Sequence, residues 1–366
     1  MLEARWPFEA VNVIERSGPA CVVLGALHQR RIWPQDLAGM DAEDFESSDG
    51  LFGGPPCIAF SMLGKGEGLY SVKGEPFLQC LAMIQVLANR EERPLKWVVL
   101  ENVKAFMYER SSGSAAEEVR KWWAEYMKAW TPLEPYLVNA NECHSAQDRA
   151  RVFLISFALD FAEAVGGLPE KPMVCQTPRL EPFLLPLSVV DEHSKRKPTP
   201  KMKKNIEGFA RHFKKQMHLT CEQVKGLTET TYAIFDASRK APVPGVKPSH
   251  SSRLFIERCP TLTYQNSYLY VAKLGPDGSK VSSRGRFLDV RERANLCGVE
   301  WTSVDGLCSN LEHSRQFGNM IPVDLVGTIL ERVISKWLVW EQRLVSLSLH
   351  NVGSHLASSQ SSKCRL

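Results

Sequence analysis

Short apolar segments alternate with amphipathic helical patterns over the first 160 residues, and this alternation limits the possible folds more than any other feature of the chain. The predicted strands are residues 11–14, 50–52, 96–100 and 151–157, and the predicted helices are residues 75–89 and 117–130. Strands that alternate with helices are typical of a parallel sheet with crossover helices. We therefore expect an α/β fold.

The pattern changes along the chain in a way that predicts several parts. Residues 1–162 form the α/β domain, and residues 163–254, which are rich in proline and lysine, form a smaller second module. Regular patterns return over residues 255–340, which we expect to complete the first domain, and they include an amphipathic helix from Asp324 to Trp340. Residues 341–366, rich in serine, are expected to be a flexible tail.

The composition of the chain excludes several classes of protein. With 44% hydrophobic and 23% charged residues among 366, the chain is expected to be globular. No apolar run approaches the roughly 18 residues that cross a bilayer, so we expect no membrane partner. The ten cysteines include no Cys-x-x-Cys pair, so we expect neither a metal site nor a disulfide framework. The expected location is the nucleus for a eukaryotic source and the cytoplasm otherwise.

Positive charge is concentrated between Lys195 and Lys215. Nine lysines or arginines occur there against one acid, Glu207, a local charge of 9 − 1 = +8, whereas the net charge of the whole chain is +4. Such a segment is typical of an element that binds a polyanion, although a solvated loop or a nuclear-import signal has the same composition. The candidate phosphate-binding residues are Lys195, Arg196, Lys197, Lys201, Lys203 and Lys204.

Three groups of reactive or polar residues lie next to predicted strands. Two glycines and two prolines precede Cys57, so the thiol is expected on a stiff loop at the end of a strand. A second strand ends in Glu101-Asn102, and a third begins near Gln147-x-Arg149-x-Arg151. Open α/β sheets bind their ligands at the carboxyl ends of strands, so these groups predict one site.

The order of these groups resembles that of the cytosine-5 DNA methyltransferase family. Pro56-Cys57 with Phe60-Ser61 and Gly64, Glu101-Asn102-Val103, Gln147-x-Arg149-x-Arg151, Arg286 to Glu292, and Gly318-Asn319 with Pro322 are similar to its fourth, sixth, eighth, ninth and tenth motifs. The match covers most of residues 11–335. The resemblance implies a Rossmann-like domain that uses S-adenosylmethionine, with a smaller target-recognition module.

The resemblance also implies an activity, the transfer of a methyl group to carbon 5 of cytosine in double-stranded DNA. Cys57 would add to carbon 6 of a flipped cytosine, and Glu101 would serve ring nitrogen 3 as an acid. Arg151 and Arg149 would bind the carbonyl oxygen of the base and the nearby backbone or phosphate. Asn102 would hold the Pro56-Cys57 loop.

The resemblance assigns the methyl donor to residues from both ends of the chain. Glu15 corresponds to the acid that binds the ribose and Asp36 to the position that contacts adenine. Gly318 and Asn319 would close the donor pocket. Supporting roles fall to Pro56, Asn102, Gln147, Arg286 and Glu292.

Two departures from the family pattern leave alternatives open. Ile58 stands where the family usually has glutamine, and the segment before residue 15 contains no Phe-x-Gly-x-Gly turn. We therefore expect weak donor binding, from an incomplete or a degenerate copy of the family's domain. The alternatives are a tRNA cytosine-5 methyltransferase and an inactive methyltransferase-like DNA-binding protein.

Overall fold

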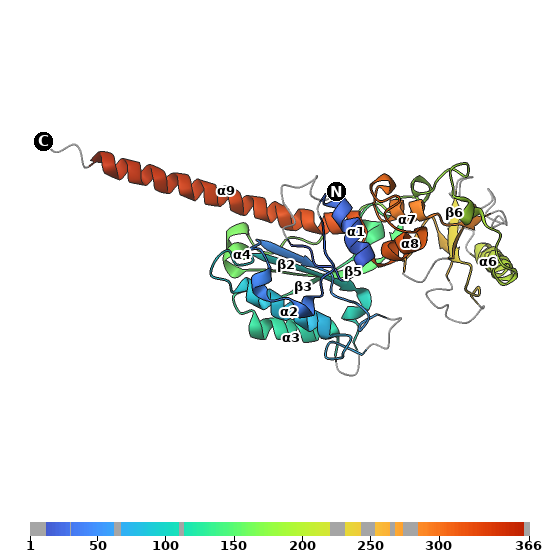
Figure 1. The fold of residues 1–366 in the computed structure, drawn as a ribbon, viewed down its shortest axis with the longest axis horizontal. Coiled ribbons are helices and arrows are strands. Elements are labelled where there is room, and N and C mark those ends of the chain that lie inside the picture. The colour runs from blue at the N-terminus through green and yellow to red at the C-terminus, as the bar shows by residue number, and fades with distance from the viewer. Residues whose placement is uncertain are drawn as a thin grey trace. The chain divides into compact units, whose positions relative to one another are not determined.

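The chain forms two compact units in a computed structural model, which describes residues 12–29, 31–61, 67–109, 113–219, 231–242, 253–263, 268–273 and 285–361 (Figure 1). One unit, here called the sheet unit, comprises Leu37–Val138, Arg151–Met173 and Gly327–Leu366. The other, here called the second unit, comprises Met1–Asp36, Asn139–Ala150 and Val174–Val326.

The sheet unit is built on four strands in the order β1-β2-β5-β3. They are β1 (Gly50–Gly53), β2 (Trp97–Val103), β5 (Ala150–Phe157) and β3 (Glu134–Asn139). Strands β2 and β5 are buried along almost their whole length, as their apolar sequences predict. The predicted strands at 50–52, 96–100 and 151–157 are therefore confirmed.

The sheet is mixed, whereas the sequence pattern predicted a parallel one. β1 pairs with β2 in parallel, with Gly53 opposite Leu100. β5 runs antiparallel to β2, with Phe153 opposite Glu101 and Arg151 opposite Val103. A run of buried apolar residues is equally compatible with a parallel and an antiparallel strand, so the sequence did not indicate that β5 is antiparallel to β2.

Helices cover the sheet of this unit. In Figure 1, α2 (Glu75–Ala88) and α3 (Ala115–Tyr126) lie below the sheet, and the part of α9 (Val323–Ser361) that belongs to this unit lies above it. The unit also contains α4 (Leu159–Val165), which contributes Phe161 to an aromatic cluster with Trp337 and Trp340 of α9. Of the aromatic residues on α3, Trp123 is buried (1% exposed), whereas Tyr126 is 46% exposed.

The second unit contains a four-stranded sheet and a short two-stranded one. The order β10-β9-β6-β7 is antiparallel throughout, with β10 (Arg286–Phe287), β9 (Leu269–Lys273), β6 (Tyr232–Asp236) and β7 (Phe255–Ile256). β4 (Gln147–Asp148) pairs in parallel with β8 (Cys259–Pro260).

Five helices of the second unit lie in the described residues: α1 (Gly18–Leu27), α5 (Glu192–Lys195), α6 (Pro200–Leu219), α7 (Val290–Leu296) and α8 (Asn310–Asn319). α6 packs on the four-stranded sheet because it is amphipathic, and Phe209 stacks on Phe235 with ring centroids 4.5 Å apart. α7 and α1 contribute to a separate core cluster, in which Val23 and Leu27 of α1 pack against buried residues.

Three features differ from the sequence prediction. Residues 12–14, expected as part of a strand, join no ladder among the described residues; instead, the backbone oxygen of Glu15 accepts a hydrogen bond from the amide of Gln35 (2.8 Å). Residues up to Asp36 group with the second unit rather than with the sheet, because α1 packs there. α9 continues to Ser361, beyond the predicted end at Trp340.

None of the described helices is long and apolar enough to cross a membrane.

The core next to β1 generates a stability prediction. Phe60 is fully buried and meets the rings of Phe106 and Phe77 edge to face, with centroids 4.8 and 5.7 Å away. Phe60→Ala is expected to lower the free energy of unfolding by about 3–5 kcal/mol, through lost burial and the cavity left behind. Urea denaturation measures the change. Tyr70→Ala, at a side chain that is 72% exposed, is the control and should cost less than about 0.5 kcal/mol; a Phe60 variant as stable as this control would contradict the packing described.

Candidate functional site

The turn that follows β1 presents Cys57. Gly54, Pro55 and Pro56 continue from the strand, and the carbonyl of Cys57 then accepts hydrogen bonds from the amides of Phe60 and Ser61, both at 2.9 Å. The thiol is not in a disulfide, and the residue is partly exposed. Because Phe60 lies in the core, this turn is fixed at both ends. Gly64, which the sequence analysis grouped with this turn, lies outside the described residues.

Asn102 connects the neighbouring strand to this turn. Its side chain is only 1% exposed, and its Nδ2 donates a hydrogen bond to the carbonyl of Pro55 (3.3 Å). Its Oδ1 accepts from the amide of Val103 (2.9 Å), which fixes the orientation of the amide group. Asn102 thus ties β2 to the residues immediately before Cys57.

Glu101 and Arg151 form a nearly buried ion pair across two strands. Because Glu101 lies opposite Phe153, and Arg151 opposite Val103, both side chains lie on the same face as diagonal neighbours. Arg151 Nε is 2.8 Å from Glu101 Oε1, and the two side chains are 11% and 10% exposed. The antiparallel direction of β5 therefore creates this pair.

The same end of the sheet carries the turn and the ion pair. Gly53 is paired with Leu100, so the chain leaves β1 toward Cys57 at the level where β2 reaches Glu101. A thiol, a carboxylate and a guanidinium at one sheet end can perform nucleophilic addition to a flat polar ring while its ring nitrogen and carbonyl are bound. This is the candidate active site of the sheet unit.

Arg149 occupies a different environment from Arg151, in the second unit. It is 2% exposed, and its Nη1 donates to the carbonyls of Leu262 (2.6 Å) and Gly318 (3.2 Å). Its Nη2 donates to the carbonyl of Asn319 (3.3 Å). These backbone contacts differ from the base contact expected for Arg149. The contacts place Arg149 beside Gly318 and Asn319, the two residues that were expected at the methyl donor.

Gln147 is also buried in the second unit, where its side chain contacts the backbone. Its side chain is fully buried, and Nε2 donates to the carbonyl of Leu296 (2.8 Å), at the end of α7. The hydroxyl of Ser145 donates to the same carbonyl (3.1 Å). Gln147 therefore joins β4 to α7, consistent with a supporting role.

The two acids expected at the donor lie in adjoining segments of the second unit. The amide of Gln35 donates to the backbone oxygen of Glu15, which holds Asp36 near the segment of Glu15. The Glu15 carboxylate accepts from the amide of Ser17 (2.7 Å), and Asp36 lies 3.5 Å from Arg16 with its side chain 54% exposed. Carboxylates on such segments can accept hydrogen bonds from ribose hydroxyls and from the adenine amino group.

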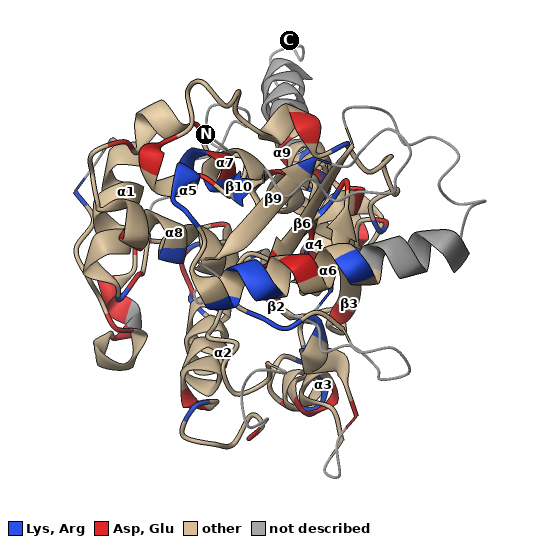
Figure 2. Ribbon diagram, turned by 90° about the vertical axis from the view of Figure 1, so that its right-hand side faces the viewer, with Lys and Arg blue, Asp and Glu red and all other residues tan. Residues whose placement is uncertain are grey.

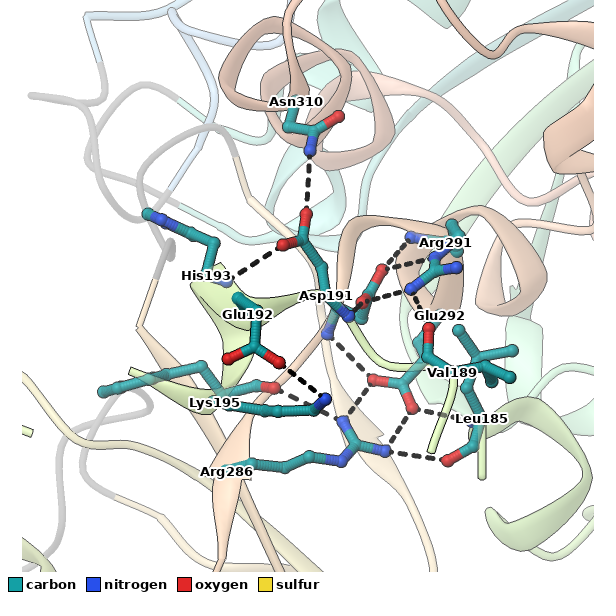
Figure 3. A network of polar contacts seen from close by, with 12 residues as sticks. Leu185, Val189, Asp191, Glu192, His193, Lys195, Arg286, Arg291, Glu292 and Asn310 are labelled. Carbon is teal, nitrogen blue, oxygen red and sulfur yellow. Dashed lines mark hydrogen bonds and ion pairs between the residues drawn. The ribbon is translucent and has the colours of Figure 1, made fainter. Parts of the chain in front are cut away.

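Arg286 and Glu292 belong to a polar network that joins β10 to α7 (Figure 3). Both terminal nitrogens of Arg286 contact the fully buried carboxylate of Glu292, with Nη1 2.7 Å from Oε2. Arg286 Nη2 also donates to the carbonyl of Leu185 (3.2 Å), and the amide of Leu185 donates to Glu292 Oε1 (2.7 Å). The network thereby fastens the 185–195 segment to the core of the unit.

Asp289 is a member of this network that the sequence analysis missed. It is the N-cap of α7 and forms a capping box with Glu292, a pattern of Asp-x-x-Glu that the sequence shows. Its Oδ2 accepts from the amide of Asp191 (2.8 Å) and from the side chain of Arg291 (3.0 Å). Burial acts to raise the pKa of Asp289, but the hydrogen bonds from Arg291 and Asp191 outweigh it and hold that pKa below its ordinary value.

The basic segment lies mainly on α6 and on the residues before it. Lys201, Lys203 and Lys204 are exposed near the start of α6, whose Ile206 and Phe209 are buried, and Figure 2 colours the basic stretches of this helix blue. Lys197 is exposed, and Lys195 lies 2.9 Å from Glu192. Arg196 differs, because its guanidinium lies over the rings of Phe287 (4.7 Å) and Tyr268 (5.2 Å).

The described part of the chain contains no group of three histidine, cysteine, aspartate or glutamate residues placed to hold a metal ion.

Comparisons with known proteins place these observations in a family. Residues 4–335 match the family model of the C-5 cytosine-specific DNA methylases. The type II methyltransferase M.HhaI of Haemophilus parahaemolyticus is 26% identical over 298 residues, which are 80% of this chain and 78% of that protein. The type II methyltransferase M.FnuDI of Fusobacterium nucleatum is 28% identical over 133 residues, so the match spans 36% of each protein.

Solved structures show a similar fold. The Entamoeba histolytica methyltransferase EhMeth aligns with a TM-score of 0.60 over 92% of this chain and 95% of its own, at 11% identity. Its similarity supports the expected Rossmann-like methyltransferase fold.

The lowered pKa of Asp289 generates a prediction about acid stability. A carboxyl whose pKa is lowered in the folded protein stabilises it above the ordinary pKa and loses this contribution as the pH falls through the lowered value. The free energy of unfolding of the wild type should therefore fall more steeply between about pH 5 and pH 2 than that of Asp289→Asn. Denaturant titrations at several pH values measure both slopes. Equal slopes in the two proteins would contradict the role of Asp289.

Proposed function

This chain belongs to the C-5 cytosine-specific DNA methylase family, and on that premise we propose that it transfers a methyl group to carbon 5 of cytosine in double-stranded DNA. The observation that carries the proposal is the set of side chains at one end of the sheet: Cys57 on its turn beside the Glu101–Arg151 ion pair. The substrate cytosine is proposed to enter this site flipped out of the duplex, because a base within the stack cannot expose its ring to a thiol.

The methyl donor is S-adenosylmethionine, the cofactor of this family. When bound, it supplies an electrophilic methyl group. The residues present suit its nucleoside part, since Glu15 and Asp36 provide carboxylate acceptors on segments joined by the Gln35–Glu15 hydrogen bond. We assign the ribose to Glu15 and the adenine to Asp36.

Cys57 is assigned the role of nucleophile. Carbon 5 of cytosine is a weak nucleophile until a thiolate adds to carbon 6, which moves electron density toward carbon 5. The addition requires the sulfur to approach one face of the ring, and the hydrogen-bonded turn after Pro56 fixes the position from which it does so. After carbon 5 has gained the methyl group, a base such as water takes its proton, the ring double bond forms again and the bond between carbon 6 and sulfur breaks.

Glu101 and Arg151 are assigned to the edge of the base that carries ring nitrogen 3 and the carbonyl oxygen. As the thiolate adds, ring nitrogen 3 gains electron density and needs a proton or a strong hydrogen bond, which a carboxyl group can supply. A guanidinium is a planar group of N–H donors, which suits the carbonyl oxygen of cytosine, and Arg151 lies beside Glu101 where that oxygen would be bound. Arg151 also orients Glu101 through the same ion pair.

Arg149 is assigned a positioning role in place of contact with the base. Its guanidinium fixes the carbonyls of Gly318 and Asn319, so it sets the backbone that the family resemblance places at the donor. Gln147 contributes by joining β4 to α7. Both side chains are buried, which suits residues that position others.

The basic face of α6 is proposed to bind DNA phosphates. Lys201, Lys203 and Lys204 are exposed within about one turn of a helix whose Ile206 and Phe209 are buried in the core, so three positive charges reach solvent close together. Lysine clusters of this kind bind phosphates without reading the base sequence. A hollow of about 550 Å³ that includes Lys195 and Arg286 in its lining lies in the same unit.

The proposed nucleophile generates the most specific prediction. Incubated with S-adenosylmethionine and a duplex that contains 5-fluorocytosine, the wild type should form a covalent complex, because fluorine cannot leave carbon 5 as a proton does. Cys57→Ala should form none, because it lacks the sulfur. Denaturing electrophoresis of labelled DNA detects the complex.

Cys175→Ala, at another partly exposed cysteine, is the matched control and should trap DNA as the wild type does. A complex that persists in Cys57→Ala would contradict the assignment. Trapping of a structured RNA in preference to the duplex would favour the tRNA alternative.

A second prediction concerns the α6 lysines. Replacing Lys201, Lys203 and Lys204 with glutamine should weaken DNA binding at low salt and reduce the slope of log K against log salt by about 0.9 for each lost phosphate contact. Fluorescence anisotropy over a salt series measures both quantities. Lys121→Gln with Lys128→Gln, at exposed lysines of the sheet unit, should leave the slope unchanged. An unchanged slope in the α6 variant would exclude this face from the DNA interface.

A further inference from the structure

The C-terminal end of α8 supplies Gly318 and Asn319, which the family resemblance places at the methyl donor. The last four carbonyls of an α-helix lie beyond its regular hydrogen bonds, so each needs a donor from elsewhere. Arg149 donates to the carbonyls of Gly318 and Asn319, and the amide of Met320 donates to the carbonyl of Gln316 (2.8 Å). Three of the four carbonyls are thereby fixed by nitrogen donors.

Cys297, just after α7, supplies a donor for the fourth carbonyl, that of Phe317. Its side chain is fully buried, and its Sγ lies 3.5 Å from the Phe317 oxygen. A carbonyl oxygen only accepts, so the thiol donates its S–H in this contact. The same sulfur accepts from Gln147 Nε2 (3.5 Å). Burial raises the pKa of Cys297 to about 11, so the thiol keeps its proton at neutral pH.

The backbone of Cys297 holds the far end of the same segment. Its carbonyl accepts a hydrogen bond from the amide of Val323 (2.9 Å), where α9 begins. The next residue, Gly298, has a φ of +72°, and a Cβ there would lie 3.2 Å from the Cβ of Val323. Glycine therefore permits this close approach. Cys297 contacts the chain on both sides of Gly318 and Asn319, through its thiol and through its carbonyl.

We propose that Cys297 is a positioning residue for the methyl donor, because its thiol fixes the end of α8 that carries Gly318 and Asn319. This inference rests on the proposed function, which uses S-adenosylmethionine as the donor. Phe317 is only 3% exposed, so its carbonyl would lose the thiol in a place that water hardly reaches. The end of α8 then has to shift to find another donor. Cys297 has no part in the bond changes at the cytosine ring.

Three variants separate the S–H donor from the volume of the sulfur. Cys297→Ala removes both, whereas Cys297→Ser keeps a side-chain donor at the same position. Cys259→Ala is the matched control, because Cys259 is also 0% exposed and belongs to the same core cluster. Calorimetric titration with S-adenosylmethionine measures the Kd of the donor, circular dichroism checks folding, and methyl transfer to duplex DNA gives kcat and the KM for the donor.

Cys297→Ala should raise the Kd and the KM for the donor at least about fivefold, because a buried carbonyl loses its partner. Its kcat at saturating donor should stay within about twofold of the wild type, since Cys297 touches no reacting atom. Cys297→Ser and Cys259→Ala should each bind the donor within about twofold of the wild type, because the one keeps a donor for Phe317 and the other leaves the thiol of Cys297 in place.

An unchanged Kd in Cys297→Ala, or a loss as large in Cys297→Ser or in Cys259→Ala, would overturn the role of Cys297. If Cys297→Ala does not fold, the serine variant decides, because weakened donor binding there contradicts the proposal and retained binding supports it. A wild type that binds no donor would contradict the donor site and the role of Cys297 together. A wild type that binds the donor but traps no 5-fluorocytosine duplex would contradict the proposed reaction alone, and the donor affinities would still decide the role of Cys297.

Discussion

The antiparallel pairing of β5 with β2 creates the interaction on which the candidate active site depends. Its register places Arg151 diagonally from Glu101 on one face of the sheet, where the two side chains form an ion pair at 2.8 Å with little exposure. A shift of the register by one residue would turn one partner to the opposite face. Removing either partner would leave a charge in a nearly buried place, which is costly. Asn102, the next residue on β2, then ties this pair to the turn of Cys57.

A second set of buried charges organises the other unit. Arg286, Glu292 and Asp289 join a short strand, the start of α7 and the 185–195 segment that leads to the basic helix α6. Each buried carboxylate here accepts several hydrogen bonds, which offset the cost of its burial. The network holds the 185–195 segment, and the lysines of α6 follow this segment in the chain. The sheet unit is therefore proposed to carry out the reaction at the cytosine ring, and the second unit is proposed to bind DNA phosphates.

The sequence predicted most of the strands and helices of the sheet unit, because their hydrophobic patterns are strong and their ends carry clear signals such as Pro76. It did not predict the direction of β5, since buried strands look alike in both directions. It also misplaced Arg149, because charge alone does not show that a guanidinium is buried against backbone carbonyls. Asp289 could have been found from its spacing to Glu292. The hydrogen bond from Asn102 to Pro55 and the ring contact of Phe60 with Phe106 join residues that are distant in the sequence, so no local pattern encodes them.

Glu101 and Arg151 are proposed to act on the base as one unit. A double-mutant cycle of methyl transfer to duplex DNA, with Glu101→Gln, Arg151→Met and the double variant, tests it most directly. Each single variant is expected to lose at least about a hundredfold in turnover, and the double variant should be hardly slower than the worse single one, since the effects of residues that act together are not additive. Losses that multiply in the double variant, or single variants with nearly normal turnover, would contradict it.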